Sequence, residues 1–210
     1  MKSEIFPKLD DLYSSKNPLV RNLFWGRINT ALSLAEIKNN SVVLDVGCGS
    51  GHLMKTIRKY NSECECYATD VQDYKITEAV KCKFQIADVK KLPFEDNKFN
   101  LVFALDVLEH LRENVGFAIK EIHRILRPDG SVILSGPTES WSYRFCRSLL
   151  YYFSKESAHP ARQEIDFHYH TIYHLESEFV GSGFILSVGT NLPGFPLPTL
   201  FRIVRFQKQS

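Results

Sequence analysis

The chain has 210 residues, which is enough for one α/β domain with a sizeable core but too few for two full domains and a linker. Its 26 basic and 24 acidic residues give a formal charge of +2, and the basic residues are scattered, so nothing predicts an obligatory nucleic-acid partner. The N-terminus lacks the apolar core of a signal peptide, and no apolar run is long enough to span a bilayer. We therefore expect a cytoplasmic protein without a transmembrane segment.

The cysteines give no sign of a disulfide framework or a zinc ribbon, because their number, 5, is odd and no two have C-x-x-C spacing. Cys64 and Cys66 lie on one face of a predicted strand and could share a metal. Buried free thiols are the better interpretation.

The first 40 residues are expected to form a helical cap over the domain. Asn17 and Pro18 are a helix-start signal, and the apolar spacing that follows predicts an amphipathic helix from about Leu19 to Ile37. Arg21 and Arg27 lie toward its other faces.

The chain is organised around residues 42–52. Val42–Val46 is an apolar run typical of a buried parallel strand, and it leads through Gly47, Gly49 and Gly51 into a helix-compatible segment, His52–Tyr60. The spacing is G-x-G-x-G instead of G-x-G-x-x-G, and Asp45 precedes the first glycine by two residues. A carboxylate there would repel a pyrophosphate and favour a cationic ligand, which makes a dinucleotide-dependent oxidoreductase the weaker alternative.

Further strands end in acidic residues. Cys64–Thr69 is predicted to be a strand that ends in Asp70, placed to receive two hydrogen bonds from a ribose diol.

The predicted elements that follow are a helix over Tyr74 to Val80, strands over Lys83–Ala87 and Leu101–Leu105, a helix over Glu113–Leu126, a turn at 127–130, a strand over Ser131–Ser135, a helix over Ile172–Gly181, and a hairpin of Phe184–Thr190 and Arg202–Phe206. Strands that alternate with helices predict a parallel sheet with helices on both faces.

Over about residues 40 to 190, the sequence resembles the class I S-adenosylmethionine-dependent methyltransferases, in particular their small-molecule (type 11-like) branch. The segments that carry the resemblance are the glycine stretch with Asp45, Tyr67-Ala68-Thr69-Asp70-Val71, the Leu92-Pro93-Phe94 segment that follows Asp88-Val89, and Asp106-Val107-Leu108-Glu109-His110-Leu111. The resemblance implies S-adenosyl-L-methionine as cofactor and S-adenosyl-L-homocysteine as product.

The resemblance also implies a set of cofactor-binding residues: Asp45, Gly47, Cys48, Gly49, Gly51, Asp70, Val71, Asp88, Val89 and Leu105. In this set Val71 would touch the adenine, Asp88 would accept from its amino group, and the backbone N–H of Val89 would reach a ring nitrogen. In some members an arginine near the N-terminus holds the cofactor's carboxylate, so Arg21 and Arg27 are candidates, although both could equally be solvated surface residues.

The expected fold class is α/β: a Rossmann-like, doubly wound, mostly parallel seven-stranded sheet with an antiparallel C-terminal hairpin and a lid insertion after strand five. A single methyltransferase domain would cover residues 1–210, with an N-terminal helical cap (1–40), a cofactor-binding core (41–135), a substrate lid (136–170), and a C-terminal helix with closing strands (171–210).

The expected function is methyl transfer to an oxygen, nitrogen or carbon atom of a small molecule. The aromatic residues of the lid indicate an apolar or ring-bearing acceptor or peripheral contact with a membrane surface, although packing on the sheet also explains them. No Asn/Asp-Pro-Pro-aromatic tetrad follows the fourth strand, which argues against amino groups of adenine or glutamine as acceptors. A catalytically silent, methyltransferase-like binding module is the alternative. The sequence does not predict the oligomeric state.

Four residues are candidates for a catalytic base, and none can be assigned: Asp106, Glu109, His110 and His168. His168 and His170 alternate and could ligate a metal with His159 or His174. Because no well-spaced carboxylate or cysteine completes that set, we expect no metal site.

Overall fold

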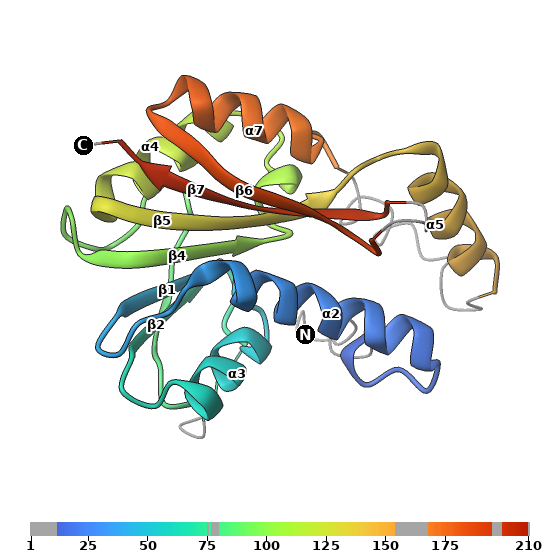
Figure 1. The fold of residues 1–210 in the computed structure, drawn as a ribbon, viewed down its shortest axis with the longest axis horizontal. Helices are drawn as coiled ribbons and strands as arrows, with labels where there is room; N and C mark the ends of the chain where they lie inside the picture. The colour runs from blue at the N-terminus through green and yellow to red at the C-terminus, as the bar shows by residue number, and fades with distance from the viewer. Residues whose placement is uncertain (1–11, 75, 77–79, 154–167, 195–198, 210) are drawn as a thin grey trace.

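The computed structural model describes residues 12–74, 76, 80–153, 168–194 and 199–209. At its centre is a seven-stranded sheet in the order β3-β2-β1-β4-β5-β7-β6 (Figure 1). The strands are β1 (Val42–Val46), β2 (Glu65–Asp70), β3 (Lys83–Ile86), β4 (Phe99–Leu105), β5 (Leu126–Pro137), β6 (Phe184–Leu192) and β7 (Phe201–Lys208). The first five are parallel, whereas β7 runs antiparallel to both β5 and β6. The predicted fold class, including the antiparallel hairpin, is confirmed.

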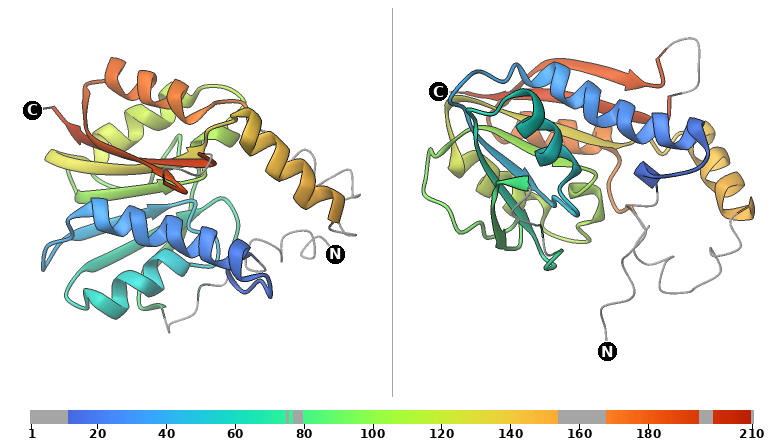
Figure 2. Two further views of the ribbon diagram at one scale, coloured as in Figure 1. Left: turned by 45° about the vertical axis from the view of Figure 1, so that its right-hand side comes forward. Right: turned by 90° about the horizontal axis from the view of Figure 1, so that it is seen from below.

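Helices cover both faces of the sheet (Figures 1 and 2). They are α2 (Pro18–Ala35), α3 (His52–Tyr60), α4 (Val115–Ile125), α5 (Trp141–Phe153) and α7 (Ile172–Gly181), with a 3-10 turn η2 (Leu108–His110) after β4. Successive strand residues point to opposite faces. Leu44 accordingly packs in a cluster with residues of α4 and α7, and Val43 packs in a second cluster with residues of α2 and α3.

Capping fixes the starts of α2 and α7. The side chain of Asn17 accepts a hydrogen bond from the backbone N–H of Leu19 (3.0 Å), and proline occupies the first turn of α2. The helix ends at Ala35, two residues before the predicted end, because Glu36 takes a left-handed conformation (φ 49°). The Thr171 side chain caps α7, which has the predicted bounds.

The segment predicted to be a turn at 127–130 lies inside β5. Leu126 already pairs with Phe99, and Ser131 pairs with Leu101, so the residues between them bulge out of a strand that continues to Pro137. The sequence located the irregular backbone correctly but could not show that Leu126 pairs with β4. The predicted helix over Tyr74 to Val80 lies mostly outside the described residues.

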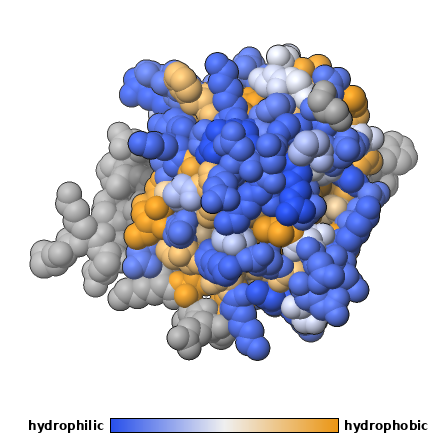
Figure 3. All heavy atoms as spheres, turned by 90° about the vertical axis from the view of Figure 1, so that its left-hand side faces the viewer, coloured by the Kyte–Doolittle hydropathy of each residue, from blue (hydrophilic) through white to orange (hydrophobic). Residues whose placement is uncertain are grey.

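Beyond the carboxyl end of β5, α5 projects away from the sheet (Figure 1). It lies in the predicted lid, of which residues 154–167 are outside the described part of the chain. Trp141 and Phe145 on this helix are 79% and 60% exposed. The opposite end of the molecule is covered mostly by hydrophilic side chains (Figure 3). Within the described residues, no helix combines the length and apolar character that crossing a membrane requires.

Candidate functional site

The glycine loop between β1 and α3 is held against the end of β2. The backbone N–H groups of Gly47 and Cys48 both donate to the Thr69 carbonyl, at 2.8 and 3.0 Å. Gly47, Gly49 and Gly51 all have positive φ, at 67°, 50° and 76°. This backbone conformation strongly favours glycine.

Two of these glycines have different surroundings. A Cβ added to Gly47 would lie 2.4 Å from Cγ2 of Val107, so this position must be glycine for the loop to pack against the segment after β4. A Cβ added to Gly49 would meet no atom of the described residues within 4 Å. Gly49 therefore borders open space in which a ligand could approach the backbone.

Asp45 and Asp70 come together beside this loop, as expected for the carboxyl ends of neighbouring parallel strands. Asp70 accepts hydrogen bonds from the backbone N–H groups of Gly49 (3.0 Å) and Gln72 (3.1 Å), which fix its carboxylate. Asp45 is 3% exposed, and its burial together with the charge of Asp70 raises its pKa well above the ordinary range. A cationic ligand would relieve the cost of holding these two carboxylates together.

The other predicted cofactor residues lie at the neighbouring strand ends. Asp88 follows β3 closely, since the N–H of Ala87 donates to the Asp70 carbonyl (2.9 Å). The Asp88 carboxylate is exposed, accepts from the Lys90 N–H (2.9 Å) and forms an ion pair with the Lys90 side chain (3.4 Å). Val89 is buried in the core.

Three predicted residues remain. Val71 is 65% exposed directly after β2, and Leu105 is half-buried at the end of β4. Cys48 is buried within the glycine loop, and burial raises the pKa of its thiol. The described structure thus joins Asp70 to Gly49 by a hydrogen bond, brings Asp45 close enough to Asp70 for their charges to interact, and puts the other predicted residues on the same loops and strand ends.

The two candidate arginines of α2 differ in their surroundings. Arg21 is exposed and donates to the Ser15 carbonyl (3.1 Å). Arg27 is buried, forms an ion pair with Asp106 and donates to the Tyr13 hydroxyl (3.1 Å). Its Nε has no hydrogen-bond partner among the described residues. Only Arg27 is therefore enclosed at the carboxyl end of β4.

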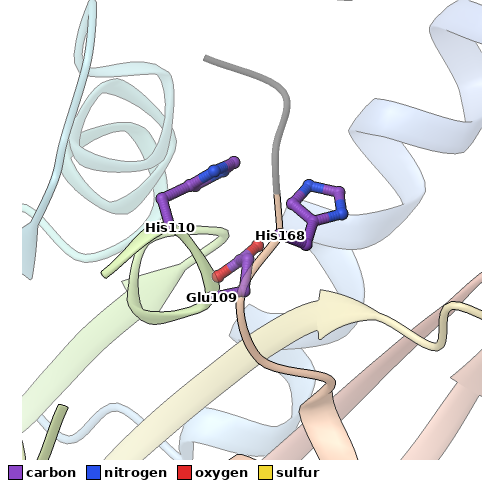
Figure 4. Close-up of side chains that lie close together, drawn as sticks. All are labelled: Glu109, His110 and His168. Atoms are coloured by element: carbon purple, nitrogen blue, oxygen red, sulfur yellow. The ribbon is translucent and has the colours of Figure 1, made fainter. Parts of the chain in front are cut away.

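Further along the same edge, Glu109, His110 and His168 converge (Figure 4). Glu109 and His110 belong to η2, and His168 comes shortly before α7. The N–H of Tyr169 donates to the Glu109 carbonyl (2.8 Å) and so fixes the two segments together. The Glu109 side chain is buried, and burial raises its pKa to about 8.

His168 and His170, the alternating histidines considered as metal ligands above, have different neighbours in the structure. Residues 169 and 170 form a bend, and the His170 ring stacks on His174 with 4.8 Å between centroids. His159 lies outside the described residues. The sequence missed that His168 meets Glu109 and His110, because no local pattern links positions 58 residues apart along the chain.

Comparison with known proteins agrees with this geometry. Residues 44–134 match the family profile described as "Methyltransferase domain". Cycloartenol-C-24-methyltransferase 1 of Oryza sativa subsp. japonica is 35% identical over 102 residues, which are 44% of this chain and 29% of that protein. Chloroplastic tocopherol O-methyltransferase of Arabidopsis thaliana is 32% identical over 118 residues, 52% of this chain and 32% of that protein.

A solved structure, the complex of the Haloferax volcanii Trm112 methyltransferase activator with a methyltransferase, shares the fold at a TM-score of 0.70. Its sequence identity is 13%, and the match covers 95% of this chain and 96% of that one. The matched segment is about a third or less of each of the two curated relatives described above.

The family match makes residues 44–134 a methyltransferase domain, and together with the relatives and the fold it supports a class I S-adenosylmethionine-dependent methyltransferase of the type 11 kind. S-Adenosylmethionine is the cofactor of these enzymes. The residues present fit it: open space at Gly49, a fixed carboxylate at Asp70, and the buried Asp45 whose burial favours a cationic neighbour.

Proposed function

We propose that this protein transfers a methyl group from S-adenosylmethionine to an oxygen, nitrogen or carbon atom of a small-molecule acceptor. The observation that carries the proposal is the position of Asp45 and Asp70 beside a loop of three positive-φ glycines. A cofactor with a sulfonium charge and an adenosine moiety needs a negative, open and backbone-lined binding site, and this arrangement offers one.

Each residue has a proposed role in binding. Asp70 would receive the two ribose hydroxyls, Asp45 would favour the cationic part of the cofactor, and Arg27, not the exposed Arg21, would receive its carboxylate. The remaining residues proposed to line the site are Gly47, Cys48, Gly49, Gly51, Val71, Asp88, Val89 and Leu105. When bound, the cofactor supplies an already activated methyl group, so these residues need mainly to align the reactants and exclude water.

The acceptor is proposed to be apolar or ring-bearing. Exposed Trp141 and Phe145 on α5 support this, as do Tyr143 and Phe201, whose rings pack edge-to-face with 5.8 Å between centroids. The two curated relatives are named for methyl transfer to cycloartenol and to tocopherol, both small molecules. For a neutral acceptor, Glu109, His110 and His168 remain candidate bases, because Asp106 is engaged by Arg27 and Ser135.

Two measurements test the proposal. Calorimetric titration of the full-length protein with S-adenosylhomocysteine should show binding, and titration with NAD should not; the reverse result would favour an oxidoreductase. Incubation with S-adenosylmethionine labelled in the methyl group and a cell extract should then label extractable metabolites. Binding of S-adenosylhomocysteine without any transfer would reject the enzyme and leave a binding module.

A further inference from the structure

The grouping of Glu109, His110 and His168 has the composition of a metal site. One ligand atom from each side chain lies within 4.8 Å of the others, and Figure 4 shows the three side chains converging from η2 and from the segment before α7. A tetrahedral ion with bonds of about 2.1 Å holds its ligand atoms about 3.4 Å apart, so side-chain movements of about 1 Å would close the site.

Glu109 has no partner that explains its burial. Its side chain is 1% exposed, and neither carboxylate oxygen has a hydrogen bond of good geometry among the described residues; the backbone N–H groups of Glu109 and Val107 lie near enough to lower its pKa, but burial outweighs them. A buried polar group without a partner costs free energy, and natural structures retain such groups where something compensates them. A cation between this carboxylate and the two imidazoles would be that compensation.

His168 is oriented by a second carboxylate. Its Nδ1 lies 2.5 Å from Oε1 of Glu139, and both side chains are largely buried. A carboxylate can only accept hydrogen bonds, so the tautomer of a neutral His168 that suits this contact donates through Nδ1 and leaves the lone pair of Nε2 for an ion. A histidine whose second nitrogen donates to a carboxylate is the usual arrangement around a bound metal. Arg144, 3.5 Å from the other oxygen of Glu139, helps to hold this carboxylate.

The nearby charges leave room for a cation. Arg27 is the basic group whose charge reaches Glu109, and it is paired with Asp106. Glu139, 3.5 Å from the exposed Arg144, adds a carboxylate beside His168, and a bound cation would favour the ionised form of the buried Glu109.

From this geometry, we propose that Glu109, His110 and His168 bind one divalent transition-metal ion of the zinc type, with Glu139 positioning His168. Two imidazoles and one carboxylate suit Zn²⁺, Fe²⁺, Co²⁺ or Ni²⁺, whereas Mg²⁺ and Ca²⁺ prefer oxygen ligands. Three protein ligands leave at least one coordination position open. The sequence predicted no metal, because Glu109 is far from His168 along the chain.

The test is metal binding by the full-length, tag-free protein after treatment with a chelator. Titration with Zn²⁺ should give one site per chain, with a Kd in the micromolar range or below, and Co²⁺ should give the visible absorption of a low-coordinate complex. Mg²⁺ should not compete at millimolar concentration. The absence of a stoichiometric Zn²⁺ site would overturn the proposal.

Single replacements test whether these side chains bind the ion. Glu109→Gln and His168→Gln should each weaken Zn²⁺ binding at least tenfold, and Glu139→Gln about tenfold through the orientation of His168. His123→Gln, the same replacement on α4, should leave binding unchanged. If Glu109→Gln does not fold, the Zn²⁺ affinities of His168→Gln and His110→Gln test whether the cluster binds the ion. Equal Zn²⁺ affinity in the cluster variants and in His123→Gln would reject this site. Because no methyl donor is present, the result is independent of the proposed methyl transfer.

Discussion

Arg27 of α2 forms a buried ion pair with Asp106, the residue that follows β4. Asp106 also accepts a hydrogen bond from the Ser135 hydroxyl of β5 (2.8 Å), and its backbone has positive φ (56°). The pair therefore ties the N-terminal helix to the carboxyl ends of the two central strands, next to both candidate sites.

The first prediction concerns this ion pair. Asp106→Asn should lower the free energy of unfolding by about 3 kcal/mol, because it leaves the guanidinium of Arg27 buried without its counter-charge. Asparagine tolerates positive φ, so the backbone should not contribute. Urea unfolding followed by circular dichroism measures the loss. Glu36→Gln, which removes an exposed carboxylate paired with Arg205, should change stability little. Equal effects of the two replacements would contradict the prediction.

The second prediction concerns Asp70. Asp70→Asn should weaken binding of S-adenosylhomocysteine roughly 10- to 100-fold, the equivalent of about 1.5 to 3 kcal/mol for hydrogen bonds to a charged group. The amide oxygen can still accept from Gly49, but the amide nitrogen cannot accept from Gln72, so we expect the loop to keep its fold with a small decrease in melting temperature. Calorimetry measures the affinity, and Glu63→Gln is the control at an exposed carboxylate. Unchanged affinity in Asp70→Asn would remove this residue from the site.

The third prediction separates the roles of two glycines. Gly47→Ala should destabilise the fold, because its Cβ would lie 2.4 Å from Val107 and its φ is positive. Gly49→Ala should cost only the strain of positive φ, about 1 to 2 kcal/mol, yet reduce affinity for S-adenosylhomocysteine, because its Cβ enters the space left for the ligand. Thermal melts and calorimetry on both variants test this.

Gly116→Ala is the matched control for that pair. This glycine lies in α4, and in the described part of the chain an added Cβ would meet no atom within 4 Å outside the backbone of the helix itself. We expect slightly higher stability, by up to about 1 kcal/mol, and unchanged affinity. Loss of binding in Gly116→Ala as well as Gly49→Ala would show that the assay does not report on the site.

The fourth prediction is a pH dependence that comes from His123. Burial and the charge of Lys208 lower its pKa from the ordinary value of 6.5. Below pH 6.5 the unfolded chain therefore binds a proton that the folded chain does not, so this residue lowers stability as the pH falls. His123→Gln removes that contribution. The free energy of unfolding should thus fall less between pH 7 and pH 5 in the variant than in the parent, as measured by urea titrations. Parallel curves would contradict the assignment.

The end of the sheet where we propose that the cofactor binds could be predicted from the sequence, because the residues that form it lie in short, continuous segments. Val42–Val46 and the three glycines adjoin one another in sequence, and parallel pairing of β1 with β2 brings Asp45 near Asp70 whatever the rest of the chain does. The start of α2 could be predicted for the same reason, because Asn17 and Pro18 are adjacent in the sequence and cap the helix.

Features that depend on tertiary packing could not be anticipated. The start of β5 at Leu126 requires Phe99 as a partner, and the meeting of Glu109 with His168 requires the segment before α7 to return beside η2. No hydrophobic periodicity or local motif in the sequence predicts either contact. Arg27 and Arg21 likewise look alike in the helical pattern, and only the fold shows that one is enclosed.

The position of β7 between β5 and β6 sets the order in which the sheet can be completed. During synthesis β6 emerges first and has no neighbour to pair with until residues 201–208 follow, since β7 hydrogen-bonds to both flanking strands. Joining β5 to β7 closes a long loop, and contacts so distant along the chain form slowly. The nascent polypeptide would therefore carry an unprotected strand edge until its last strand has been inserted.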